Sequence, residues 1–222
     1  MTLADQVTLA RLGLMPMAVA AYLLLPVEGN LCFWIAAAIC GLAEYTDLLD
    51  GQIARRRNEV SDFGKLADPF CDVIYRIGVF LALLLPAGGV GWLVTAPGNI
   101  GQLVFAVPEG LGCGLVPWLP VFLMVLREVI AGALRAMTAT KGLVLAARTS
   151  GKVKAWLQGI TLITSLAFPA VLGGRQPWML TWAFWATWVT AVVSVLSILE
   201  YFWVNRRVLG QLIDRRPVEK SL

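Results

Sequence analysis

Long apolar runs, each closed by a short break of polar, glycine and proline residues, dominate the hydrophobic pattern of this chain. Each run is close to the ~20 residues that a helix needs to cross a bilayer. The breaks fall where turn-forming residues gather, as in the stretch GGRQP at residues 173–177. The pattern predicts an all-α protein with six membrane-spanning helices, at residues 9–26, 31–54, 66–86, 117–140, 155–173 and 177–204.

The 222 residues suit one membrane domain that covers residues 1–222. Residues 86–117, between the third and fourth runs, are rich in glycine and proline, and Glu109 is their only charged residue. We expect them to form a long extracytoplasmic connection. The first apolar run has no basic stretch before it, so we expect a retained helix and not a cleavable signal peptide.

Composition supports a membrane location: 59% of the residues are hydrophobic, 14% are charged and the mean hydropathy is +0.76. Soluble domains carry about 25% charged residues. The chain has no histidine, and its four cysteines are scattered without a CxxC pair. Without these ligands, a bound metal is expected to be held by oxygen atoms, which suits Mg²⁺, Mn²⁺ or Ca²⁺.

Basic residues gather on one side of the six-helix arrangement. That side holds Arg11, Arg55, Arg56, Arg57, Lys65, Lys141, Arg148, Lys152, Lys154, Arg206, Arg207, Arg215, Arg216 and Lys220. The loops of the other side hold Glu28, Glu109 and Arg175. The positive-inside rule therefore places both termini and the basic loops in the cytoplasm, facing anionic lipid headgroups.

Four aspartates stand out on the same side, in the stretch DLLDGQIARRRNEVSDFGKLADPFCD at residues 47–72. Asp47 and Asp50 are three residues apart and Asp68 and Asp72 four apart, so each pair shares one helix face. Two antiparallel helices joined by the polar turn would bring the pairs together. Carboxylates at this density repel unless cations lie among them. The pattern favours one or two divalent ions and chemistry at phosphorus, in which a carboxylate can accept a proton.

The acids belong to a longer pattern, D-x-x-D-G-x-x-A-R-x8-G-x3-D-x3-D. Its fixed positions are Asp47, Asp50, Gly51, Ala54, Arg55, Gly64, Asp68 and Asp72. The pattern is identified as the signature of the CDP-alcohol phosphatidyltransferase family. The resemblance implies a membrane enzyme with six helices around a cytoplasm-facing polar cavity, which uses Mg²⁺ or Mn²⁺, usually two ions, to displace CMP from a CDP-linked lipid with an alcohol.

The resemblance also implies a role for each site residue. Asp47, Asp50, Asp68 and Asp72 would ligate the metals, and Asp72 would be the general base. The CDP-diacylglycerol site would include Asp5, Gln6, Thr8, Gly51, Ala54, Arg55, Ser61 and Gly64, with Arg11 nearby. The family further implies a homodimer in a bacterial-type inner membrane, with lipids and no nucleic acid as partners.

Two later stretches, LREVIAGALRAMTATKG and SGKVKAWLQ, resemble the bacterial phosphatidylglycerophosphate synthases of this family. Charges within an apolar helix are costly, and an anionic acceptor would compensate them. We therefore expect Arg127, Arg135 and Lys152 to bind the phosphate of glycerol 3-phosphate, with Lys154 close by and Glu128 paired with one of the arginines. Asp5 and Val73 depart from the synthases, which have asparagine and lysine there; Arg76 is expected to occupy space similar to that of the lysine.

Other functions stay open at this stage. The same chemistry could use inositol phosphate, inositol, serine or phosphatidylglycerol as the acceptor. A small cation transporter also places acids within membrane helices, although usually near the bilayer midplane. An inactive lipid-binding relative is the third alternative. Release of CMP from CDP-diacylglycerol separates the enzyme from the last two.

Overall fold

The computed structural model describes residues 3–25, 27–57, 62–88, 114–140, 149–172 and 177–213. Within these ranges the protein is helical, with six long α-helices, one short 3₁₀ turn and no strand. The helices are α1 (Leu3–Leu24), α2 (Leu31–Arg57), α3 (Asp62–Leu83), α6 (Trp118–Thr140), α7 (Thr149–Leu172) and α8 (Pro177–Ile213), with the turn η1 (Glu28–Asn30) before α2. The six predicted helices are therefore confirmed.

The helix ends differ from the predicted ones. The helix α1 begins at Leu3 and α8 continues to Ile213, although the predicted spans were 9–26 and 177–204. Polar residues such as those of DQVT in α1 continue the backbone hydrogen bonds of a helix although they end its apolar run. Hydrophobicity marks the part of a helix that suits a membrane, and not the helix itself.

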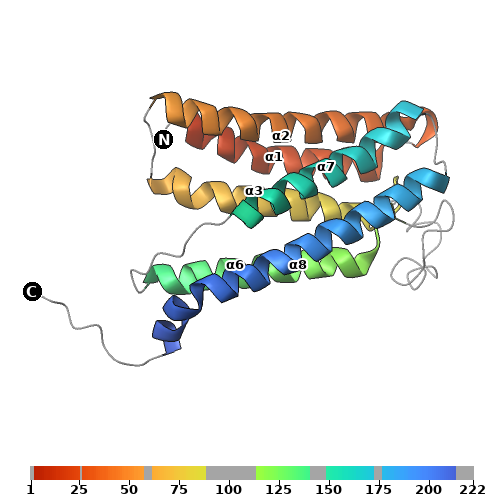
Figure 1. Cartoon of the computed structure of the whole chain (residues 1–222). Helices are drawn as coiled ribbons and strands as arrows, with labels where there is room; N and C mark the ends of the chain where they lie inside the picture. Colours follow the sequence, from red (N-terminus) through yellow and green to blue (C-terminus); the bar gives the residue numbers. More distant parts are fainter. Residues whose placement is uncertain are drawn as a thin grey trace, which may run out of the picture.

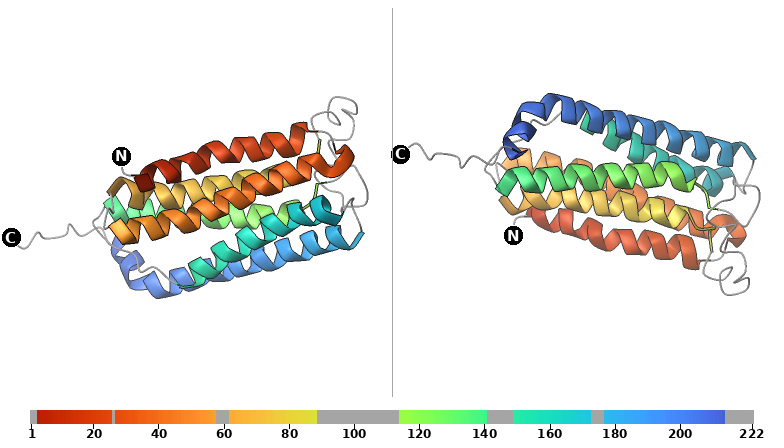
Figure 2. Two further views of the ribbon diagram at one scale, coloured as in Figure 1. Left: turned by 90° about the horizontal axis from the view of Figure 1, so that it is seen from above. Right: turned by 90° about the horizontal axis from the view of Figure 1, so that it is seen from below.

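The helices form a bundle of two groups, as Figure 1 shows. In one group α1 packs against α2 and α3, and in the other α8 packs against α6 and α7. Contact between α2 and α7 joins the groups, and α3 also contacts α6 and α7. Successive helices run in opposite directions, so α1 begins and α8 ends at the end of the bundle where α2 meets α3 (Figures 1 and 2). We call this end, formed by residues 47–57 and 62–72, the acidic end.

The opposite end of the bundle is closed by backbone contacts between α1, α3 and the start of α6. The Tyr22 hydroxyl donates a hydrogen bond to the Leu85 carbonyl oxygen at 2.9 Å. The Gly88 amide donates to the Tyr22 carbonyl at 3.0 Å, and Gly88 has a φ of 66°, which suits glycine. A Cβ on Gly114 would come within 2.2 Å of the Leu84 carbonyl oxygen, so this position requires glycine. These contacts hold the bundle together away from the acidic end.

The surface is more apolar than that of a soluble protein, and several charged side chains lie in the interior. Large apolar side chains face outward, including Trp203 (70% exposed) and Trp185 (62%), whereas Arg11 (1%) and Lys154 (6%) are buried. Two helical stretches among the described residues, Ser150–Leu172 and Trp178–Arg206, are long and apolar enough to cross a membrane. An apolar exterior, with charged side chains inside the bundle beside the apolar core, is the arrangement expected of a membrane protein.

Candidate active site

The residues of the acidic signature lie on the first three helices. The helix α2 carries Asp47, Asp50, Gly51, Ala54 and Arg55, α3 carries Gly64, Asp68 and Asp72, and α1 carries Asp5, Gln6 and Thr8. Among these side chains the structure describes that of Asp72. The other side chains of the set lie outside the described residues, and so does Ser61 as a whole.

Two side-chain contacts join α3 to α2. The Tyr75 hydroxyl of α3 donates a hydrogen bond to the Cys40 carbonyl of α2 at 3.2 Å. One turn further along α2, the Arg76 guanidinium of α3 donates two hydrogen bonds to the Glu44 carboxylate, both at 3.1 Å. Both contacts lie inside the bundle and join α3 to α2.

The helix bounds place the four aspartates along the bundle. The helices α2 and α3 are antiparallel, and the end of α2 and the start of α3 lie at the same end of the bundle (Figure 1). Asp47 and Asp50 lie ten and seven residues before the end of α2, and Asp72 and Asp68 lie ten and six residues after the start of α3. The backbone thus carries both aspartate pairs towards the acidic end, and the approach of their side chains stays a prediction.

The Asp72 carboxylate lies between two buried arginines. Its Oδ2 is 3.1 Å from Nη1 of Arg76, and its Oδ1 is 3.9 Å from Nη1 of Arg11. Arg11 and Arg76 are only 1% and 4% exposed, whereas 26% of the Asp72 side chain is exposed. The two arginines thus place positive charge on the buried side of Asp72, where Oδ1 lies, while part of the side chain remains exposed. A carboxylate in this position can bind a cation or accept a proton.

Arg76 is itself held from the other side by Glu44. Nε of Arg76 donates to Oε1 of Glu44 and Nη2 donates to Oε2, the two-pronged geometry that makes arginine–carboxylate pairs strong. Gly159 of α7 lies against the same carboxylate, since a Cβ there would be 3.0 Å from Oε2 of Glu44. The chain of contacts from Gly159 to Asp72 therefore crosses from α7 through α2 to α3.

A second polar cluster joins α6, α7 and α8. The Glu128 carboxylate accepts hydrogen bonds from Nη1 of Arg127, at 3.0 Å, and from Nζ of Lys154. Nε of Arg127 donates to Oγ of Ser197 at 3.2 Å. All four side chains are buried. Each of the three charged side chains has an oppositely charged partner, as buried charges in proteins usually do. The expected pairing of Glu128 with an arginine is confirmed, and Lys154 is its second partner.

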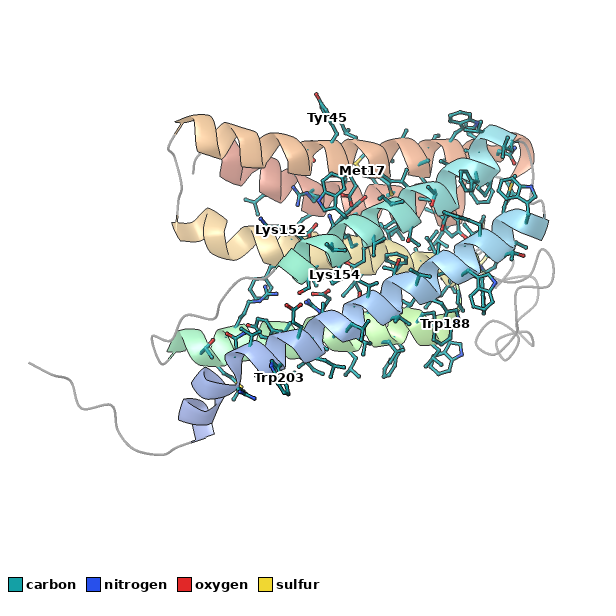
Figure 3. All side chains as sticks on the ribbon, in the orientation of Figure 1. Met17, Tyr45, Lys152, Lys154, Trp188 and Trp203 are labelled. Carbon is teal, nitrogen blue, oxygen red and sulfur yellow. The ribbon has the colours of Figure 1, made fainter. Side chains whose placement is uncertain are left out.

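The predicted acceptor residues occupy different surroundings. Arg127 belongs to the buried cluster, whereas Arg135 near the end of α6 and Lys152 in the first turn of α7 are exposed. Figure 3 shows Lys152 and Lys154 projecting from the same part of α7. Their spacing of two residues turns them to different sides of the helix. Lys154 is thus committed to Glu128, and Lys152 is available to a ligand.

The donor chemistry of the four aspartates suits a hard divalent cation. Two of them belong to α2 and two to α3, and carboxylate oxygens are the preferred ligands of Mg²⁺ and Mn²⁺. Asp72 keeps an exposed side for such a contact although two arginines approach it. Asp47, Asp50, Asp68 and Asp72 are therefore the residues that would hold the ions.

Sequence reasoning missed two members of this site, Glu44 and Gly159. Glu44 is the only charged residue between positions 31 and 46, an apolar stretch of α2. A lone acid within a membrane helix usually has a function and a partner, so its position was a usable signal. Gly159 carries no such signal, because its importance comes from a contact between helices that are far apart in the sequence.

The fold and the site together define a helical membrane protein with an acidic centre at one end of its bundle. A family model of CDP-alcohol phosphatidyltransferases matches residues 1–196, and the chain belongs to this family.

Several relatives carry the name CDP-diacylglycerol–glycerol-3-phosphate 3-phosphatidyltransferase. The protein from Rickettsia felis is 29% identical over 175 residues, which cover 78% of this chain and 91% of that protein. The protein from Pseudomonas fluorescens is 26% identical over 172 residues, covering 78% and 72%. The protein from Sodalis glossinidius is 32% identical over 165 residues, covering 73% and 75%.

Proposed function

We propose that this protein transfers the phosphatidyl group of CDP-diacylglycerol to sn-glycerol 3-phosphate, giving phosphatidylglycerol phosphate and CMP. The name shared by the relatives supports this reaction and this acceptor. The structural observation that carries the proposal is the Asp72 carboxylate, the last acid of the signature, held between Arg11 and Arg76.

The proposed setting is the inner membrane of a bacterial-type cell, which all six helices cross. The acidic end would face the cytoplasm as a polar cavity, with both termini on that side. The apolar exterior supports this arrangement, and so does the helix topology, in which α1 begins and α8 ends at the acidic end. The basic residues on the same side agree with the positive-inside rule.

The donor, CDP-diacylglycerol, would bind at the acidic end. Its site would consist of Asp5, Gln6, Thr8, Gly51, Ala54, Arg55, Ser61 and Gly64. In this arrangement Arg55 holds a phosphate of the donor, and the small residues of α2 and α3 allow its diphosphate to approach the helices. Two Mg²⁺ or Mn²⁺ ions held by the aspartates would supply charge neutralisation at the diphosphate.

The acceptor would meet the donor at Asp72. In the proposed reaction the Asp72 carboxylate takes the proton of the glycerol 3-phosphate 1-hydroxyl, whose oxygen attacks the phosphorus that carries diacylglycerol. A new P–O bond forms, the P–O bond to CMP breaks, and CMP leaves with the electron pair. Arg127, Arg135 and Lys152 bind the acceptor phosphate, and Arg127 shares its charge between that phosphate and Glu128.

The proposed assembly is a homodimer. The helices α6 and α8 expose the large apolar side chains of Phe122, Leu126, Leu196 and Trp203, which suit contact with a second copy or with lipid. A cross-linking measurement in membranes, with monomer as the contrary result, tests this assignment separately from the reaction.

An acceptor screen tests the proposed reaction. Purified protein in detergent receives CDP-diacylglycerol and Mn²⁺ or Mg²⁺, and CMP release is followed with glycerol 3-phosphate, inositol phosphate, inositol, serine or phosphatidylglycerol. We expect release with glycerol 3-phosphate, and mass spectrometry of the lipid should show phosphatidylglycerol phosphate. Release with another acceptor alone would contradict the acceptor and keep the chemistry. Folded protein that releases no CMP with any acceptor would contradict the enzyme.

A further inference from the structure

Glu44 is an acid that the proposed reaction does not use. It lies on α2 one turn before the first signature aspartate and is 19% exposed. Both of its carboxylate oxygens accept a hydrogen bond from Arg76, and on its other side lies the backbone of Gly159. The Glu44 carboxylate of α2 is therefore enclosed by contacts from two other helices, α3 and α7.

The Arg76 guanidinium divides its nitrogens between two acids. Nε and Nη2, which form its two-pronged side, donate to Glu44, and Nη1 lies 3.1 Å from Asp72. Asp72 is four residues before Arg76 on the same helix, so the two side chains are neighbours whatever else is present. Glu44 therefore determines which nitrogen atoms of the Arg76 guanidinium face Asp72.

The division matters because a two-pronged pair occupies both oxygens of a carboxylate. If Arg76 turned that side to Asp72, both Asp72 oxygens would be engaged with the guanidinium. With Glu44 in place, Arg76 contacts Oδ2 of Asp72 through one nitrogen, Oδ1 lies buried towards Arg11, and 26% of the Asp72 side chain stays exposed. Stability alone does not explain the Glu44–Arg76 pair, because well-packed apolar residues often replace a buried ion pair without loss.

We propose that Glu44 is a positioning residue for Asp72: it holds the two-pronged side of Arg76 and so keeps the Asp72 carboxylate oriented and accessible for the reaction. Gly159 contributes to the same arrangement, because the absence of a side chain there leaves room for the Glu44 carboxylate. The inference rests on the proposed function, because it takes Asp72 as a residue of the reaction.

A double-mutant cycle of Glu44→Gln and Arg76→Gln tests the inference. The kcat and KM values for both substrates are measured by CMP release from purified protein. In Glu44→Gln we expect kcat to fall roughly 10–100-fold, the range found for residues that orient a reacting group, while KM for glycerol 3-phosphate stays within about threefold. In the Arg76→Gln background, Glu44→Gln should change kcat less than about twofold, because Glu44 acts through Arg76.

Two further variants separate positioning from a loss of folding. Glu44→Asp keeps the charge and should recover part of the lost kcat. Tyr22→Phe removes a buried hydrogen bond at the opposite end of the bundle and should leave kcat unchanged. Thermal unfolding of every variant shows how much folded protein each assay contains.

The outcomes distinguish this inference from the proposed function. An active wild-type protein with an equally active Glu44→Gln variant would overturn the inference alone. The inference would also be overturned if the fold-losses of kcat in Glu44→Gln and Arg76→Gln simply multiplied in the double variant, because the two residues would then act independently. If the wild-type protein uses a different acceptor, the same cycle is measured with that acceptor, since the inference concerns Asp72 and not the acceptor site. A wild-type protein inactive with every acceptor would contradict both.

Discussion

Gly159 of α7 lies against the Glu44 carboxylate of α2 so closely that a methyl group on it would come within 3.0 Å of Oε2 and 3.1 Å of Cδ. Two helices from different halves of the sequence thus meet at an acid and a glycine. The contact matters beyond packing, because Glu44 holds the arginine that contacts Asp72.

Gly159→Ala should lower activity through this contact. The added methyl group would displace the Glu44 carboxylate by a few tenths of an ångström, and small misplacements of a reacting group are costly. We expect kcat for CMP release to fall about tenfold, measured at saturating substrates. Gly41→Ala on α2 is the matched control, since a Cβ there meets nothing within 4 Å. Equal activity of both variants would show that the contact has no influence on the reaction.

Asp72→Asn should remove most of the turnover. The amide cannot accept the hydroxyl proton, and general-base catalysis typically contributes about 10²–10⁴ in rate. The side chain keeps its size, so the protein should remain folded, as thermal unfolding in detergent would show. Glu28→Gln on η1, at the opposite end of the bundle, is the control for loss of an acid and should stay active. Full activity of Asp72→Asn would exclude Asp72 as the base.

Glu128→Gln should destabilise the protein. The substitution leaves Arg127 and Lys154 buried beside a neutral amide, and breaking a buried ion pair typically costs about 3–5 kcal/mol. We expect a clear drop in the midpoint of thermal unfolding, followed by tryptophan fluorescence. An unchanged midpoint, with Glu28→Gln as reference, would mean that the cluster does not hold α6 and α7 together.

Thr161→Val tests a smaller contact between α7 and α8. The hydroxyls of Thr161 and Thr190 are 2.8 Å apart in the buried interface. Valine keeps the shape and loses the hydrogen bond, which is worth about 0.6 kcal/mol on average between membrane helices. We expect a small decrease in unfolding midpoint and unchanged CMP release. A decrease as large as that of Glu128→Gln would show that this interface depends on the bond more than we infer.

Removal of divalent cations should stop the reaction. The four aspartates offer only oxygen ligands, so a chelator such as EDTA should abolish CMP release and added Mn²⁺ or Mg²⁺ should restore it. Zn²⁺ is expected to restore activity poorly, because neither histidine nor a cysteine pair is available at this centre. Full activity in EDTA would contradict the metal assignment.

The number of helices and the antiparallel direction of α2 and α3 followed from the sequence because both depend on local spacing. Apolar runs near 20 residues predicted each helix, and the short polar segment between α2 and α3 predicted an antiparallel pair. The ends of the helices were harder to predict, since the backbone of α8 continues through polar residues to Ile213. Local spacing therefore predicts the presence of a helix better than it predicts where the helix begins and ends.

The partners of the buried charges could be predicted only in part. The sequence placed Arg76 near Asp72 because they are four residues apart on one helix. It did not indicate that Glu44 takes the other side of Arg76, or that Lys154 pairs with Glu128, because those contacts join different helices. Such pairings depend on how the helices pack, which a local pattern does not contain.

The ion pair between Glu44 and Arg76 also constrains how the chain can enter a membrane. An arginine alone at the centre of a helix disfavours insertion by about 2.5–3.5 kcal/mol, and a lone acid is disfavoured as well. In the folded protein each of these charges finds its counterion on the neighbouring helix. If α2 and α3 cross the membrane as proposed, their joint entry would keep each of these charges with its counterion.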